Sequence, residues 1–157
     1  MNLYVEGFLV ELQGIPVTLG VSAFALILGV MLGLVLALMR TSEKKPLKII
    51  SGIYIEIVRG TPLIVQALVV AYGIPYFLQQ HHVEFKWSLL LIPAFIVCGL
   101  NSAAYMAEVI RGGIQAVDKG QREAALSLGM TKTQVNRLVV LPQAFRIVIP
   151  SFGNEFV

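Results

Sequence analysis

The sequence predicts an all-α, polytopic transmembrane helical bundle with about three complete spans, a polar loop and the start of a further span. Of the 157 residues only 13% are charged and 57% are hydrophobic, whereas soluble domains carry about 25% charged and 45–50% apolar residues. So small a globule has too little interior to bury this apolar excess. The twelve Lys and Arg lie mainly between long uncharged runs. This distribution indicates membrane topology rather than the basic patch of a nucleic-acid-binding protein.

The first predicted span covers residues 14–39, which are uncharged. At 1.5 Å per residue such a helix reaches about 39 Å, enough to cross a hydrocarbon core of about 30 Å with some tilt. A signal peptide is excluded, because no Lys or Arg precedes Arg40 and a cleavable apolar region is only about 7–15 residues long. Small residues at every fourth position predict one face on which a second helix approaches closely. They are Ala25, Gly29, Gly33 and Ala37.

The second predicted span covers residues 61–80. Thr61 is suited to an N-cap and Pro62 to the first helical position, whereas Gly73 and Pro75 are expected to bend or end the helix. Just before it, Glu56 and Arg59 are three residues apart, on one helical face, and are expected to form an interfacial ion pair.

The third predicted span covers residues 87–108 and opens with Trp87, a residue suited to the membrane interface. Ten Lys and Arg flank one end of the three runs and only Lys86 lies at the other. The positive-inside rule therefore places the N-terminus outside and the loop at 111–142 in the cytoplasm. The ten are Arg40, Lys44, Lys45, Lys48, Arg111, Lys119, Arg122, Lys132, Arg137 and Arg146.

Two short helices are predicted in this loop. Asp118 followed by Gln121 resembles a capping box, and Gly129 is suited to a left-handed helix stop, so the first helix should run over residues 119–128. A second capping pair, Thr131 with Gln134, should open the next helix. Its apolar face should consist of Val135, Leu138 and Val139.

The loop also carries the motif that indicates function. The run EAALSLG at 123–129 is followed by nine residues and then by VVLP at 139–142. It resembles the signature E-A-A-x-x-x-G-x(9)-I-x-L-P of the permease subunits of ABC importers, with Val139 in place of the usual isoleucine. Further segments resemble the polar amino acid branch, the histidine, glutamine and arginine permeases. These segments are 59–63, 100–105, 111–115 and 153–156.

The resemblance covers essentially the whole chain, as a single transmembrane domain of the type I ABC importer permease over residues 1–157. It implies a multi-pass subunit of the bacterial plasma (inner) membrane that moves a polar amino acid and is not itself an enzyme. The implied partners are an ABC ATPase subunit, a second permease chain, identical or not, and an extracytoplasmic substrate-binding protein. No cofactor is expected on this chain, because ATP is bound by the partner subunit. Such permeases usually continue into further spans, so a fragment or truncated reading frame is expected.

In that family the short loop helix docks into a groove of the ATPase. The resemblance therefore assigns ATPase coupling to eight residues: Glu123, Ala124, Ala125, Leu126, Leu128, Gly129, Leu141 and Pro142. Ala124 and Ala125 are expected to expose backbone, and Leu126 and Leu128 to serve as apolar anchors. On this hypothesis, Ala125→Glu should abolish coupling.

Candidate substrate-path residues rest on weaker patterns. Asn101, Tyr105 and Glu108 share one face of the third span, where polar groups turn toward protein or water. They either line a path or bond one helix to another. Asn154 and Glu155 lie where the polar amino acid branch is expected to bind the charged ends of its substrate.

Other chemistries find little support. The sequence has no GxxxxGK[ST] phosphate-binding loop and no Ser/His/Asp or HExxH arrangement. His81 and His82 are adjacent in the outer loop, so no metal site is expected there, and the lone Cys98 cannot form an intrachain disulfide.

Three alternatives remain open at this stage: an ABC permease for another small solute, an ion-gradient-driven carrier or channel, and a non-transporting membrane scaffold. An ion-gradient carrier would need charged residues deep within the spans, which here are almost charge-free at their centres.

Overall fold

A computed structural model of the chain describes residues 3–89 and 91–156, with side chains at 7–8, 11–89 and 91–152. In this part of the chain every regular element is a helix, as the composition predicts. Three helical stretches are long and apolar enough to cross a membrane: Glu11–Thr41, Leu63–Gln80 and Leu91–Ala116. The all-helical, multi-span fold class is therefore confirmed.

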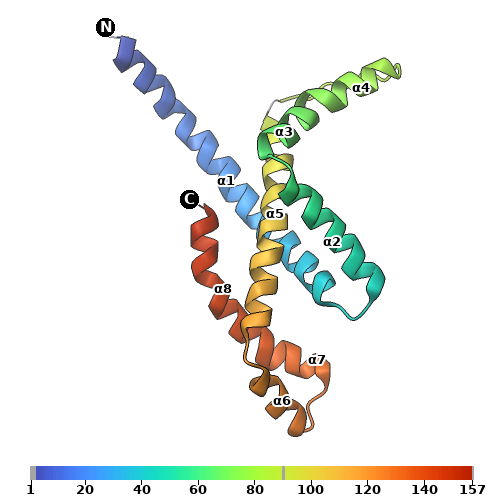
Figure 1. Cartoon of the computed structure of the whole chain (residues 1–157). Helices are drawn as coiled ribbons and strands as arrows, with labels where there is room; N and C mark the ends of the chain where they lie inside the picture. Colours follow the sequence, from blue (N-terminus) through green and yellow to red (C-terminus); the bar gives the residue numbers. More distant parts are fainter. Residues whose placement is uncertain (1–2, 90, 157) are drawn as a thin grey trace.

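The two longest helices form the centre of the molecule. Helix α1 (Leu3–Thr41) crosses α5 (Leu91–Ala116), and α5 also contacts α2 (Lys45–Gly60) and α8 (Leu141–Phe156) (Figure 1). The predicted small-residue face of α1 makes this crossing: Ala25, Gly29, Gly33 and Ala37 are all buried. Gly33 lies so close to α5 that a Cβ added there would be 2.6 Å from the Cβ of Met106 and 3.1 Å from the carbonyl oxygen of Ala103.

The second span is bent away from α2 at Thr61 and Pro62. Residues preceding proline favour extended backbone, and both Thr61 and Pro62 have extended ψ angles, 140° and 136°, so the next helix begins at Leu63. The prediction that Thr61 is the N-cap is therefore wrong. Its hydroxyl instead donates to the carbonyl oxygen of Ile57 (2.9 Å) and accepts from Nε2 of Gln66 (2.8 Å).

Beyond the bend, α3 (Leu63–Leu68), η1 (Val69–Gly73) and α4 (Ile74–Gln80) form one continuous helical stretch. Gly73 and Pro75, where the sequence predicts a bend or an end, do not end the helix, because a π-helical turn over η1 carries it through both residues. Pro75 has no N–H to give to a carbonyl of the preceding turn, and the carbonyl oxygen of Val70 in that turn instead accepts from the indole nitrogen of Trp87 (3.0 Å).

The third span differs at both ends from the predicted 87–108. Helix α5 begins at Leu91 and continues to Ala116. Trp87 lies in the preceding loop, where its indole nitrogen donates to the carbonyl oxygen of Val70 (3.0 Å) and its ring packs against Phe85. The tryptophan therefore fastens the loop between α4 and α5 to the second span.

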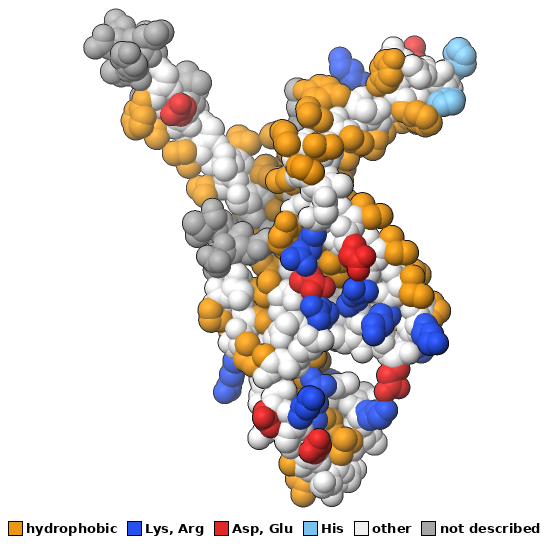
Figure 2. Space-filling model, viewed as in Figure 1, with side chains coloured by type: hydrophobic (Ala, Val, Ile, Leu, Met, Phe, Trp, Pro, Cys, Tyr) orange, Lys and Arg blue, Asp and Glu red, His pale blue; other side chains and the backbone are white. Residues whose placement is uncertain are grey.

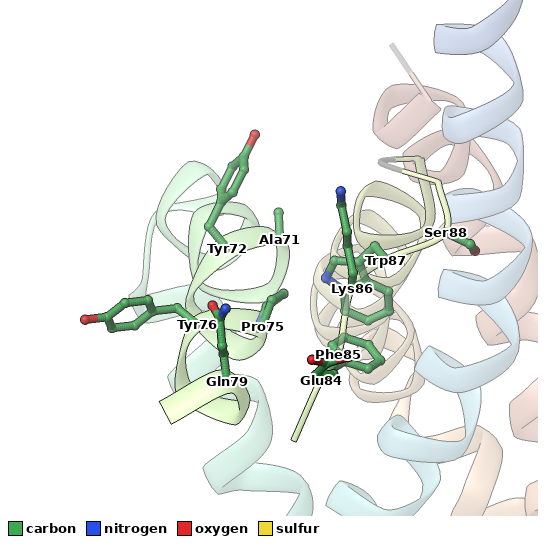
Figure 3. Close-up of a pocket in the computed structure, with 10 residues that line it drawn as sticks. All are labelled: Ala71, Tyr72, Pro75, Tyr76, Gln79, Glu84, Phe85, Lys86, Trp87 and Ser88. Atoms are coloured by element: carbon green, nitrogen blue, oxygen red, sulfur yellow. The ribbon is translucent and has the colours of Figure 1, made fainter. Parts of the chain in front are cut away.

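A pocket lies between that loop and the second span. In Figure 3, Tyr72, Tyr76 and Gln79 occupy one side, and Phe85, Lys86 and Trp87 the other. The two histidines lie at the turn that follows α4: the His81 ring packs against Phe77 with ring centres 4.6 Å apart and ring planes tilted by 59°, and His82 has a positive φ of 60°.

Large apolar side chains face outward along α1 and α2, as expected where lipid replaces water as the solvent (Figure 2). Ile27, Met31 and Val35 are exposed on α1, and Ile49, Ile53 and Ile57 on α2.

Candidate functional site

The signature lies on a compact corner formed by α6 (Lys119–Ser127), α7 (Lys132–Gln134) and η2 (Val135–Val140), at the end of the molecule opposite α4 (Figure 1). Asp118 caps α6 by accepting from the amide of Gly120 (2.7 Å). This contact replaces the capping box predicted with Gln121. Gly129 has a φ of 84° and ends the helix as predicted.

The start of the next helix also matches its prediction. Thr131 and Gln134 form a reciprocal capping box, in which Oγ1 of Thr131 accepts from the Gln134 amide and Oε1 of Gln134 accepts from the Thr131 amide. The predicted apolar face is confirmed for Val135, which is buried, and for Val139, which packs against the core, but is wrong for Leu138, because η2 is π-helical. Val135 and Val140, five residues apart, are both buried, whereas Leu138 is exposed. The wider turn of a π-helix accounts for the shifted face.

The corner is packed onto the membrane helices by a shared apolar core. Its buried members come from α1, α5, α6, η2 and α8 and the connection before α6: Ala37, Ile110, Ile114, Val117, Ala125, Val135, Val140 and Ala144. Arg122 adds a polar link, since its guanidinium donates to the carbonyl oxygen of Ile114 (2.6 Å) near the end of α5. A basic side chain at this place satisfies a carbonyl that the helix itself leaves unbonded.

The two signature alanines point in different directions. Ala124 is exposed, but Ala125 is only 6% exposed and belongs to the core, so the prediction that both expose backbone is wrong for Ala125. A charge at Ala125 would therefore disrupt the corner itself and cannot test docking.

The remaining residues of the predicted coupling site also divide into exposed ones and ones that pack against the core. Glu123, Leu126 and Leu128 are exposed, with Leu128 84% exposed at the very end of α6. Leu141 packs against the core and Pro142 is exposed at the start of α8. The surface available to a partner thus consists of Glu123, Ala124, Leu126 and Leu128, which we call the corner face.

An ion pair joins the corner to the loop after α1. Nζ of Lys132 lies 2.8 Å from Oε1 of Glu43, although the two residues are 89 positions apart. The hydrogen bond and the charge of Lys132 hold the pKa of Glu43 below its usual value, and Glu43 raises the pKa of Lys132.

The predicted polar face of α5 is turned toward α2 and α3. Asn101 donates to Oε1 of Gln66 at 3.5 Å, and Gln66 in turn donates to the carbonyl oxygen of Val58 (2.8 Å). This geometry is the helix-to-helix bond that the sequence left open as one role of Asn101. Tyr105 lies below the Arg59 guanidinium, whose carbon is 5.1 Å from the ring centre.

Glu108 is the centre of a charged network. It accepts three contacts of 2.6–3.1 Å from Arg111, and Arg59 lies 3.9 Å away. Glu56 pairs with Arg40 of α1 at 3.2 Å. The predicted Glu56–Arg59 pair is therefore wrong, because each of these residues binds a charge on a different helix. Sequence spacing reveals the Glu108–Arg111 pair, three residues apart, but cannot reveal the pairs between helices.

Asn154 and Glu155 lie in α8, and their side chains fall outside the described part of the chain. Among the described residues, no three His, Cys, Asp or Glu side chains are grouped so that they could hold a metal ion.

Comparison with known proteins places this geometry in a family. Residues 29–157 match the family of binding-protein-dependent transport system inner membrane components. The chain is 39% identical to the arginine transport system permease protein ArtQ of Bacillus subtilis strain 168, over 93% of this chain and 64% of that protein. It is 40% identical to the putative glutamine transport system permease protein GlnP of Rickettsia conorii, over 96% of this chain and 65% of that protein.

A solved structure agrees. A crystal structure of an amino acid ABC transporter with histidines superposes with a TM-score of 0.85 at 41% identity, covering 99% of this chain and 72% of that one. The chain spans about two thirds of the length of the relatives it matches. Three apolar helices, the corner and these matches together show that the chain belongs to the family of inner membrane components of binding-protein-dependent transport systems.

Proposed function

We propose that the chain is the permease part of an ATP-driven importer that moves a polar amino acid across the bacterial inner membrane. Its membership of the family and the names of its relatives support this proposal. The observation that carries it is the corner face: a short helix, fixed to α1, α5 and α8 by a common core, presents Ala124, Leu126 and Leu128 outward. A rigid projecting helix of this kind suits docking into a groove of an ATPase subunit.

The same proposal includes the partners and the orientation. A separate subunit binds and hydrolyses ATP, a binding protein delivers the amino acid, and a second permease chain completes the path. The N-terminus lies outside and the corner in the cytoplasm, in keeping with the excess of Lys and Arg at the corner end. In a Cys98→Ala background, a membrane-impermeant maleimide should label Ser88→Cys in intact cells and leave Ser127→Cys unlabelled. Labelling of Ser127→Cys would contradict the orientation.

The coupling role is tested with Ala124→Glu in the full-length permease, reconstituted with its ATPase and binding protein. A charge in the centre of the corner face should lower binding-protein-stimulated ATP hydrolysis at least tenfold, because the charge loses its water on docking. Ala116→Glu, the same change at an exposed residue at the end of α5, is the control and should retain most of the stimulation. Unchanged stimulation in Ala124→Glu would show that this helix does not dock.

The structure also favours this function over a scaffold that merely binds the ATPase. The corner shares its core with α1, α5 and α8, so a force applied to α6 reaches the membrane helices directly. A scaffold would not require that connection.

A further inference from the structure

A pocket of about 440 Å³ lies between α1, α2 and α5, on the corner side of the bend at Thr61. It is lined by charges of both signs together with one aromatic ring, and Figure 2 shows acidic and basic side chains gathered over this part of α2 and α5. Its lining includes Arg40, Glu56, Arg59, Tyr105 and Glu108.

The Arg59 guanidinium in this pocket has bonding capacity to spare. The carboxylate of Glu108 is already occupied by Arg111, which approaches within 2.6 Å. Arg59 is left at 3.9 Å from that carboxylate, too far for a hydrogen bond, and rests on the Tyr105 ring. Its side chain is 42% exposed. A guanidinium offers five N–H donors in a plane, a geometry that matches a carboxylate held by two bonds.

The Glu56 carboxylate is similarly under-used. It receives one contact, 3.2 Å from Arg40 to Oε1, and its side chain is 74% exposed. Glu56 and Arg59 are three residues apart on α2, so they project from one face about 5–6 Å apart at their Cβ atoms. They do not pair with each other, because Arg40 and Glu108 hold them toward α1 and α5. The pocket lies between the two opposite charges.

We propose that this pocket is an amino acid subsite in which Arg59 binds the α-carboxylate and Glu56 the α-ammonium of the transported molecule. The proposal rests on the function proposed above. It adds a second binding site to the transport path, on the corner side of the bundle and separate from the Asn101 region. Recognition of the two charged groups common to all amino acids makes the subsite indifferent to the side chain, which extends toward the Tyr105 ring.

The test uses the complete transporter, with its ATPase and partner permease, in lipid nanodiscs without nucleotide or binding protein. Tritiated L-arginine, L-glutamine and L-histidine are titrated separately. Arg59→Met and Glu56→Gln should each weaken binding to this subsite at least tenfold, Arg59→Lys should recover part of the affinity, and the exposed Lys45→Gln should match the unaltered protein. Equal elution volume and equal helix content by circular dichroism establish that each variant is folded.

A second measurement needs no variant. Agmatine and histamine carry the side chains of arginine and histidine without a carboxylate, so each should displace its parent amino acid from the subsite at least tenfold less well than unlabelled parent does. Equal displacement, or an unchanged Kd in Arg59→Met, would overturn the subsite. If vesicles still take up amino acids in that case, only the subsite fails; if the unaltered complex neither binds nor takes up any of the three, the proposed function fails with it.

Discussion

Gly129 has a conformation that few other residues adopt readily. Its φ is 84°, its amide donates to the carbonyl oxygen of Leu126 (2.9 Å), and the amide of Met130 donates to that of Ala125 (3.2 Å). These are the two bonds of a Schellman motif, and Met130 packs against the core that contains Ala125. The glycine thus sets both the end of α6 and the direction in which the corner face points.

Replacing Gly129 by Val should therefore destabilise the corner by about 1–2 kcal/mol, the cost of left-handed backbone for a residue with a Cβ. Gly129→Asn should cost less, since asparagine tolerates this conformation. Gly112→Ala, at a helical glycine with open space around it, is the control. The melting temperature of the full-length complex and its binding-protein-stimulated rate of ATP hydrolysis should both be highest in the control, lower in Gly129→Asn and lowest in Gly129→Val. Equal behaviour of Asn and Val would refute this explanation.

At the scale of single residues, the sequence predicted local hydrogen bonds better than which side chains are buried or exposed. The residue types at Asp118, Gly129 and Thr131 specify local bonds, and all three act near the predicted positions. The burial of Ala125 depends on Val135 and Val140, whose positions are set by a π-helical turn that no residue pattern announces. The sequence therefore identified the signature but not which of its residues a partner can touch.

At the scale of the helices, the close crossing of α1 and α5 depends on Gly33, which has no side chain at the point of contact. Gly33→Ala would bring a Cβ to 2.6 Å from the Met106 Cβ and 3.0 Å from the Ala107 backbone nitrogen. Since these are fixed parts of α5, the helices must separate, at about 1–3 kcal/mol. Gly20→Ala, on the same helix with nothing within 4 Å, should be neutral or stabilising. Melting of the detergent-solubilised full-length protein measures both; a Gly33→Ala variant as stable as Gly20→Ala would contradict the close crossing.

The small-residue spacing on α1 was sufficient to predict this face, because a four-residue repeat holds one side of any α-helix. Residue spacing could not predict the bend at Thr61 or the ion pairs Arg40–Glu56 and Arg59–Glu108. They depend on how α2 is tilted against α1 and α5, which is a property of tertiary packing. Periodicity therefore predicted the helices and one interface, while the charged pocket required the three-dimensional structure.

In the whole molecule, the apolar core and the Glu43–Lys132 ion pair both join the corner to the rest of the chain, and they differ in kind. The apolar core reaches α1, α5 and α8 and is buried. The Glu43–Lys132 pair reaches the loop after α1 and is almost fully in water, with the two side chains 84% and 78% exposed. Exposed pairs add little to stability and are screened by salt. We therefore expect the core to hold the corner in place, and the ion pair to limit its motion relative to the first loop.

The effect of pH on this pair follows from the two pKa shifts. Because the pKa of Glu43 is lowered, the stabilisation that ionised Glu43 gives to the ion pair is complete above the usual pKa of a glutamate, 4.5. It is lost as the pH falls through the lowered value. Because the pKa of Lys132 is raised, the stabilisation that charged Lys132 gives to the ion pair is complete below its usual pKa of 10.5 and is lost as the pH rises through the raised value.

The pair is therefore intact at neutral pH, where Glu43→Lys should speed amide hydrogen exchange in α7 and leave the melting temperature almost unchanged. The exchange of both charges, Glu43→Lys with Lys132→Glu, should restore slow exchange, and added salt should abolish the difference between the single and double variants. A large fall in melting temperature on Glu43→Lys would instead mean that the first loop, rather than the apolar core, holds the corner.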